Sequence, residues 1–180
     1  MSAPREFAVT PPDLRLPGLI LVAVLLACAS ALAFGWHEMQ GRHALWAGLA
    51  ATIIAPALVL AALFRRKVTF DGHTLYIVAG LNQTRVAAGM LSPGEARVVD
   101  LATNAEYRLG IKSFGTSMPG YHAGHFRQVR GRKVFALVTD KHRVLVLPER
   151  DSRLLMLSLD KPQALLDALH QAQGHGESRR

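Results

Sequence analysis

Two long apolar runs occupy the first third of the chain, and shorter apolar runs separated by turn residues follow them. Residues 18–36 form 19 consecutive positions without a formal charge, and residues 43–64 form a second such run of 22. A helix rises about 1.5 Å per residue, so each run is long enough to cross a hydrocarbon layer of ~30 Å. Only residues 37–42 separate them. The pattern therefore predicts a two-helix transmembrane hairpin over residues 18–64.

Basic residues near the ends of the two runs predict how the hairpin is oriented. Five flank the hairpin and one lies in its connector: Arg5, Arg15, Arg65, Arg66 and Lys67 against Arg42. Lys and Arg are retained on the cytoplasmic side of a membrane. We therefore expect a multi-pass protein with both termini in the cytoplasm, residues 1–17 being a cytoplasmic N-terminal segment.

The remainder of the chain has the periodicity of strands. Apolar runs recur every eight to ten residues with turn signals such as Asp71-Gly72 between them, which is typical of a small barrel or sandwich. The first runs lie at residues 67–70, 74–79, 84–91, 96–101 and 107–112, and the later ones at 124–129, 133–139, 143–147 and 154–157. Residues 67–173 are thus predicted to form a cytoplasmic domain.

The period changes to that of an amphipathic helix after Asp160. Pro162 suits the first turn of a helix, and the apolar face falls on Leu165, Leu166, Leu169 and Ala172. Residues 174–180 are polar and are expected to be a disordered tail. The predicted fold class is α+β, mainly β: two transmembrane helices, then an antiparallel β-barrel or sandwich capped by a C-terminal helix.

Charge bears on the partners of this domain. The chain has 21 Lys and Arg against 13 Asp and Glu, a net charge of +8. The excess could attract anionic lipid headgroups, or it could serve only solubility and orientation. Nucleic acid is not expected as a partner, because no helix-turn-helix, zinc-finger or RNP pattern accompanies the charge. The one cysteine, Cys28, excludes a disulfide within the chain.

Two sets of residues are candidates for an interaction site. Cations around two predicted hairpin ends could contact phosphate headgroups or an acidic partner, or form a solvated rim. A glycine-rich stretch could be a functional loop or a structural crossover, with its tyrosine packed at a corner. The candidate patch is Arg127, Arg130, Arg132, Lys133, Lys141 and Arg143, and the candidate loop is Gly115, Pro119, Gly120, Tyr121 and Gly124.

Chemistry-bearing patterns are otherwise sparse. His122 and His125 would point to opposite faces of a strand, and neither they nor His142 come with the carboxylates or cysteines of a metal site. The sequence has no phosphate-binding loop, nucleophile elbow or zinc-protease motif. We expect no metal, no cofactor, no catalytic residues and no enzymatic activity.

Residues 113–169 carry a more specific signal. The matching elements are Gly115-Thr116, Pro119-Gly120-Tyr121, Gly124-His125-Phe126, Val138-Thr139-Asp140, the run from Val144 to Pro148, and the closing Leu157-Ser158-Leu159-Asp160-Lys161-Pro162. In these residues the chain resembles the bacterial pleckstrin-homology (PH)-like domain family that follows a membrane hairpin. The resemblance implies a helix-capped barrel at the cytoplasmic face of a bacterial inner membrane, with a role in binding or assembly.

Pattern and resemblance together predict a membrane-anchored, non-catalytic interaction or scaffolding module. Its partner would be another protein or a second copy of the chain. Two alternatives remain open: a sensor of anionic lipid headgroups, and an accessory subunit of a membrane enzyme or transporter.

Overall fold

The computed structural model describes residues 4–12, 65–128 and 131–177, together with the isolated positions 18, 22, 26, 30 and 54. The chain divides into two units, Met1–Asp13 with Arg65–Arg180, and Leu14–Phe64. The predicted membrane helices and their connector lie outside the described residues, those five positions excepted. Within the described part, no helix is both long and apolar enough to cross a membrane.

A four-stranded antiparallel sheet forms one layer of the first unit. Its strand order is β1-β2-β3-β4. The Asp71 carboxylate accepts the backbone N–H groups of His73 at 2.8 Å and Thr74 at 2.7 Å, which closes the turn between β2 and β3. The strands are β1 (Arg5–Phe7), β2 (Arg66–Phe70), β3 (Thr74–Ala79) and β4 (Asn82–Ala87).

The first of these strands precedes the apolar runs in the sequence. In β1, Arg5 pairs with Phe70 and Phe7 pairs with Val68 of β2. Beyond β1, Val9 forms an antiparallel bridge with Leu159 near the other end of the chain. The predicted N-terminal segment therefore contributes a strand to the domain, which the sequence analysis did not anticipate.

A six-stranded sheet forms the second layer, with the order β5-β9-β10-β8-β7-β6. Its strands are β5 (Arg97–Val99), β6 (Ile111–Met118), β7 (Tyr121–Arg127), β8 (Lys133–Val138), β9 (Val144–Pro148) and β10 (Leu154–Leu157). All pairs are antiparallel except β8 and β10, in which Leu154 lies beside Val134. The expectation of a wholly antiparallel sheet was wrong at this pair, because the β9–β10 hairpin places β10 next to β8.

Several predicted strands have different boundaries in the structure, and at two of them a 3-10 turn replaces part of the strand. β4 ends at Ala87, and a 3-10 turn, η1 (Ala88–Met90), follows it. The predicted strand at 107–112 was wrong, because η3 (Ala105–Tyr107) occupies its start and β6 begins only at Ile111. β6 is mostly exposed, so it lacks the alternation of apolar and polar positions that marks a half-buried strand.

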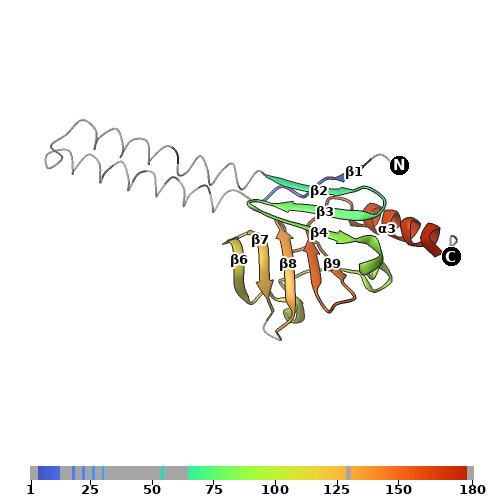
Figure 1. Cartoon of the computed structure of the whole chain (residues 1–180). Coiled ribbons are helices and arrows are strands. Elements are labelled where there is room, and N and C mark those ends of the chain that lie inside the picture. Colours follow the sequence, from blue (N-terminus) through green and yellow to red (C-terminus); the bar gives the residue numbers. More distant parts are fainter. Residues whose placement is uncertain are drawn as a thin grey trace. The chain divides into compact units, whose positions relative to one another are not determined.

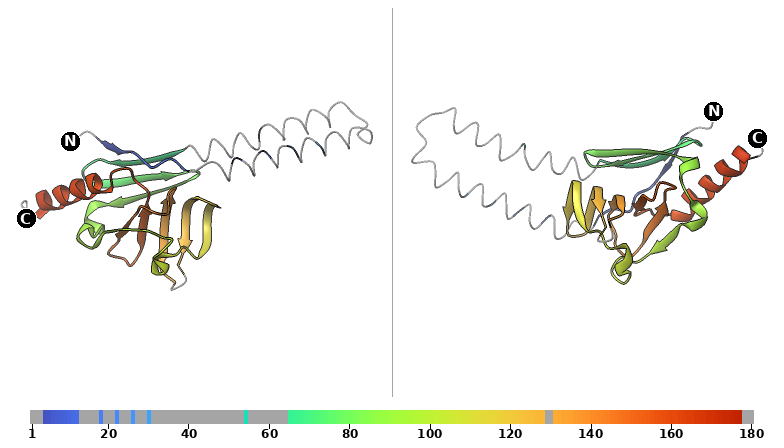
Figure 2. Two further views of the ribbon diagram at one scale, coloured as in Figure 1. Left: turned by 180° about the vertical axis from the view of Figure 1, so that it is seen from behind. Right: turned by 60° about the horizontal axis from the view of Figure 1, so that its bottom comes forward.

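Strands β2 to β4 run across the strands of the larger sheet, as Figure 1 shows and the turned views of Figure 2 confirm. The central strands β8, β9 and β10 are almost entirely buried. Val134, Ala136 and Val138 of β8 belong to a buried cluster against which Val99, Leu101, Tyr107 and Leu109 pack. The alternate residues Phe135 and Leu137 are buried on the other face. Because both faces of β8, β9 and β10 are buried, these strands are continuous apolar runs in the sequence.

A single long helix, α3 (Pro162–Glu177), follows the last strand. Its predicted apolar face is confirmed, since Leu165, Leu166 and Leu169 are buried. The Gln173 side-chain amide donates to the backbone oxygens of Ala88 at 2.8 Å and Leu91 at 2.9 Å, which fixes the helix against η1. The helix continues through Glu177, so residues 174–177 are not the disordered tail that we expected. Residues 178–180 lie outside the described part.

Candidate functional site

The predicted basic patch separates into two groups in the structure. Arg127 at the end of β7 pairs with Lys133 at the start of β8, and Arg132 lies next to them. Lys141 and Arg143 follow the opposite end of β8, roughly 15–20 Å away along a six-residue strand. The six cations therefore do not form one continuous patch, because the two hairpin ends lie at opposite ends of the same strand. Arg130 lies outside the described residues.

The group at the start of β8 borders an open cavity of about 450 Å³. The Arg153 guanidinium pairs with the Asp151 carboxylate at 2.9 Å, and Ser152 between them has a φ of 68°, which non-glycine residues seldom adopt. Arg153 was not predicted from the sequence. The turn that carries it lines this cavity only because β10 lies beside β8. The cavity is lined by Gly131, Arg132, Lys133, Asp151, Ser152 and Arg153.

The group after β8 is tied to a neighbouring turn. The Lys141 carbonyl accepts the backbone N–H of Leu101 at 2.8 Å. His142 Nδ1 lies 3.0 Å from the Asp100 carboxylate. That contact raises the pKa of His142 and lowers the pKa of Asp100, since each stabilises the charged form of the other. Part of the charge at this end is therefore already balanced by an acid.

The predicted glycine-rich loop is a β-hairpin. Gly115 lies within β6 and Gly124 within β7, where they pair with each other, and Pro119-Gly120 forms the turn. Gly115 has a φ of 143° and Gly124 a φ of 122°. A Cβ on Gly124 would overlap the Phe114 carbonyl and lie 2.9 Å from the Asn82 amide nitrogen on β4. These glycines therefore permit close packing between three strands.

Tyr121 is a packed residue, as predicted, with 1% of its surface exposed. Burial raises the pKa of its phenol, so the side chain is neutral. The Tyr121 hydroxyl and Arg66 Nη1 are buried and have no hydrogen-bond partner among the described residues. Nothing about this position suggests that Tyr121 contacts a ligand directly.

The two histidines of β7, His122 and His125, have different neighbours. His122 Nδ1 and Ser117 Oγ are hydrogen-bonded at 2.9 Å, whereas the His125 ring packs edge-on against Phe135 at 4.9 Å. Burial lowers the pKa of both histidines. Among the described residues, no three His, Cys, Asp or Glu side chains lie close enough to hold a metal ion.

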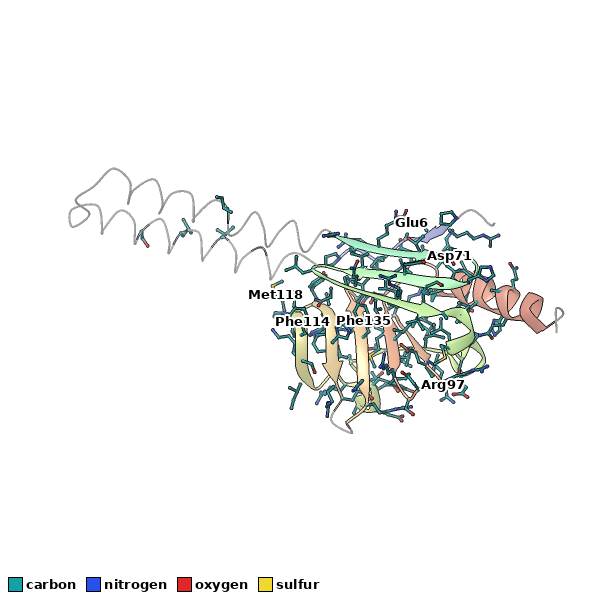
Figure 3. All side chains as sticks on the ribbon, in the orientation of Figure 1. Glu6, Asp71, Arg97, Phe114, Met118 and Phe135 are labelled. Atoms are coloured by element: carbon teal, nitrogen blue, oxygen red, sulfur yellow. The ribbon has the colours of Figure 1, made fainter. Side chains whose placement is uncertain are left out.

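The most exposed apolar surface of the larger sheet is on β6, which sequence reasoning did not select. Phe114 is 68% exposed and Ile111 is 79% exposed. Figure 3 shows Phe114 and Met118 at the β6 side of the sheet, away from Arg97 on β5. The signal in the sequence is a bulky apolar residue directly before the glycine-rich stretch, outside every predicted strand.

Comparison with known protein families gives a match over most of the domain. A family model described as a bacterial PH domain matches residues 66–173, from β2 to the last turns of α3. No curated protein and no solved structure matches the chain. The matched region contains both sheets apart from β1, and it covers more than half of the sequence. The chain belongs to the bacterial PH domain family.

Proposed function

We propose that this protein is a membrane-anchored, non-catalytic interaction module, with its PH domain at the cytoplasmic face of a bacterial inner membrane. The observation that carries the proposal is that one domain holds both ends of the apolar segment. Residues 4–12 of the domain precede segment 14–64 in the sequence, and strand β2 of the same domain follows that segment and begins at Arg66.

Several hydrogen bonds hold these two ends. Thr10 N–H donates to the Ser158 carbonyl and Asp160 N–H donates to the Ala8 carbonyl, both at 3.1 Å. Gly80 N–H donates to the Arg65 carbonyl at 2.8 Å, at the point where the chain returns to the domain. A segment whose two ends belong to one folded body must begin and end on the same side of any membrane that it enters.

This condition agrees with the apolar pattern. An even number of crossings satisfies it, and the runs at 18–36 and 43–64 supply two. The distribution of basic residues around the runs favours the cytoplasm for the domain. Geometry and charge therefore support the same topology by independent arguments.

An interaction role fits the domain better than catalysis does. The space between its sheets is filled by apolar side chains, among them Leu75, Ile77 and Leu155. Two of its buried polar side chains serve the fold: the Ser158 hydroxyl donates to the Asp140 carbonyl at 2.9 Å, and the Gln128 amide donates to the Glu106 carbonyl at 3.3 Å. PH domains commonly bind proteins or lipids, and the exposed apolar strand β6 favours a protein.

The lipid-sensor alternative rests on the basic patch. A flat membrane surface would meet cations gathered on one side of the domain, whereas Arg132 and Lys133 lie at the opposite end of β8 from Lys141 and Arg143. The separation weakens this alternative. The accessory-subunit alternative is one form of protein interaction and is compatible with the proposal.

Cysteine labelling tests the topology. In a Cys28→Ser background we would introduce Ser2→Cys, Gln40→Cys or Glu177→Cys and treat intact cells with a membrane-impermeant maleimide that passes the outer membrane. We expect position 40 to be labelled in intact cells, and positions 2 and 177 only after the inner membrane is permeabilised. Labelling of position 2 or 177 in intact cells would refute the proposal.

A further inference from the structure

We propose that the open edge of β6 binds an extended segment of a partner protein, in which acidic and apolar side chains alternate, as an added strand of the larger sheet. The inference rests on the proposed interaction function and names its surface and the chemistry of the partner. Main-chain hydrogen bonds would supply affinity, and alternate side chains would supply specificity.

The backbone of β6 is available for such pairing. β6 is the last strand in the order of the larger sheet, so only one of its sides is paired in the described domain. It has eight residues, whereas the other outer strands β1 and β5 have three each and β4 has six. Proteins usually keep exposed edges short or cover them. An open edge of this length, even with the β-bulge between Lys112 and Phe114, is available to a partner strand.

The side chains of β6 present a different chemistry on each face. Phe114 lies opposite His125 and Ile111 lies opposite Arg127, and the β-bulge between Lys112 and Phe114 brings these two exposed apolar side chains onto one face. Lys112 lies opposite Phe126, on the other face, and is exposed. An added strand would place apolar side chains beside Phe114 and Ile111, and acidic ones beside Lys112.

The charge of the surrounding sheet selects the same partner. Between Glu106 and Asp140 the chain has six Lys and Arg residues and no Asp or Glu, and this stretch contains β6, β7 and β8. A second copy would bring this positively charged stretch against an identical one, which like-charge repulsion disfavours. An acidic strand meets no such repulsion, so we commit to a different protein as the occupant.

Defined peptides test this surface on the full chain purified in a neutral detergent. The probe is a fluorescent octapeptide of alternating Glu and Val, and its control alternates Lys and Val. We expect saturable binding of the Glu–Val peptide by fluorescence anisotropy, with the Lys–Val peptide at least tenfold weaker. Hydrogen exchange should show that the Glu–Val peptide protects the backbone amides of 111–118, because an added strand pairs with them.

Variants at the two edges of the sheet provide matched controls. Phe114→Ser should weaken Glu–Val binding about tenfold or more, whereas Val98→Ser on β5, which also removes an exposed apolar side chain, should not change it. Lys112→Glu should shift the preference toward the Lys–Val peptide. Arg97→Glu on β5 changes the net charge equally and should leave the preference largely intact.

Four results would overturn the inference. The first is that the Glu–Val peptide does not bind, and the second is that it protects backbone amides outside β6 from hydrogen exchange. The third is that the free chain is a dimer that Phe114→Ser dissociates. The fourth is that phosphatidylglycerol micelles alone protect the amides of β6. The third result would make a second copy the occupant, and the fourth would make it a lipid. Peptide binding to the purified chain does not depend on the membrane topology that cysteine labelling tests. A negative result with the peptide is therefore distinguishable from a negative result for the proposed topology.

Discussion

Thr10 and Ser158, near opposite ends of the chain, are joined by a backbone hydrogen bond of 3.1 Å. The Thr139 hydroxyl donates to the Thr10 carbonyl, so both backbone groups of Thr10 have partners in the domain. The PH domain match begins at residue 66 and does not contain this segment. Residues 4–12 therefore complete a domain whose other elements lie beyond the apolar segment.

The contact between Thr139 and Thr10 should contribute measurably to stability. Thr139→Val keeps the size and branching of the side chain but leaves the Thr10 carbonyl without its donor. We expect a loss of about 1–2 kcal/mol in the free energy of unfolding. Pulse proteolysis of the full chain in urea measures it. Thr84→Val on β4 is the control and should change stability by less than about 0.5 kcal/mol; equal effects would show that the contact contributes nothing.

The long-range contact of Thr10 could not be predicted from the sequence. Arg5–Phe7 is too short to give a periodic signal, and its pairing with β2 crosses the whole apolar segment. The strands β3 and β10 were predicted with their observed boundaries because alternation or turn residues mark them locally. Local pattern thus predicts the elements, whereas the neighbours of a strand depend on tertiary packing.

Tyr121 should tolerate the loss of its hydroxyl. The hydroxyl is buried without a partner among the described residues, so folding removes it from water and gives no hydrogen bond in return. We expect Tyr121→Phe to leave stability unchanged or to raise it by up to about 1 kcal/mol. Tyr121→Ala should cost about 3–5 kcal/mol, because it leaves a cavity in the core. A loss of more than 1 kcal/mol in the phenylalanine variant would indicate a hydrogen bond to bound water.

Gly124 should be among the least replaceable residues of the domain. Gly124→Ala requires an L residue at a φ of 122° and places its Cβ against the backbone of β6. We expect a loss of more than about 2 kcal/mol in urea unfolding. Gly94→Ala is a matched control, since a Cβ there meets no atom within 4 Å and its φ is not positive. Similar losses in both variants would contradict the packing role of Gly124.

The candidate sites were predicted less well than the strands. The positions of the cations along the chain are read directly from the sequence. Whether they share one surface depends on tertiary structure, and the loops after β7 and β8 lie at opposite ends of β8. The exposed side chain of Phe114 was missed for a related reason. A phenylalanine is usually assigned to the core, and only its place on an outer strand shows that it is exposed.

The contact between His142 and Asp100 should make the charge of the β8–β9 turn depend on pH. The carboxylate raises the pKa of His142 above its ordinary value of 6.5, and Asp140 acts in the same direction. The stabilising effect on His142 is complete below the pKa of the unfolded state and is lost as the pH rises through the higher folded value. For Asp100, whose pKa is lowered, the effect is present above the ordinary carboxyl range and is lost as the pH falls through the folded value.

The pair should therefore be intact in the weakly acidic range and weaken above neutral pH. NMR titration of the His142 ring in the full chain checks this, with the signal assigned by His142→Gln. We expect a midpoint above 6.5 that moves down toward 6.5 in Asp100→Asn, because the carboxylate that pairs with the imidazole and raises its pKa is removed. Asp71→Asn, at a turn of the other sheet, should leave the midpoint unchanged. A midpoint at or below 6.5 in the unmodified chain would show that the two side chains do not pair in solution, and Lys141 and Arg143 would then lie beside a neutral imidazole.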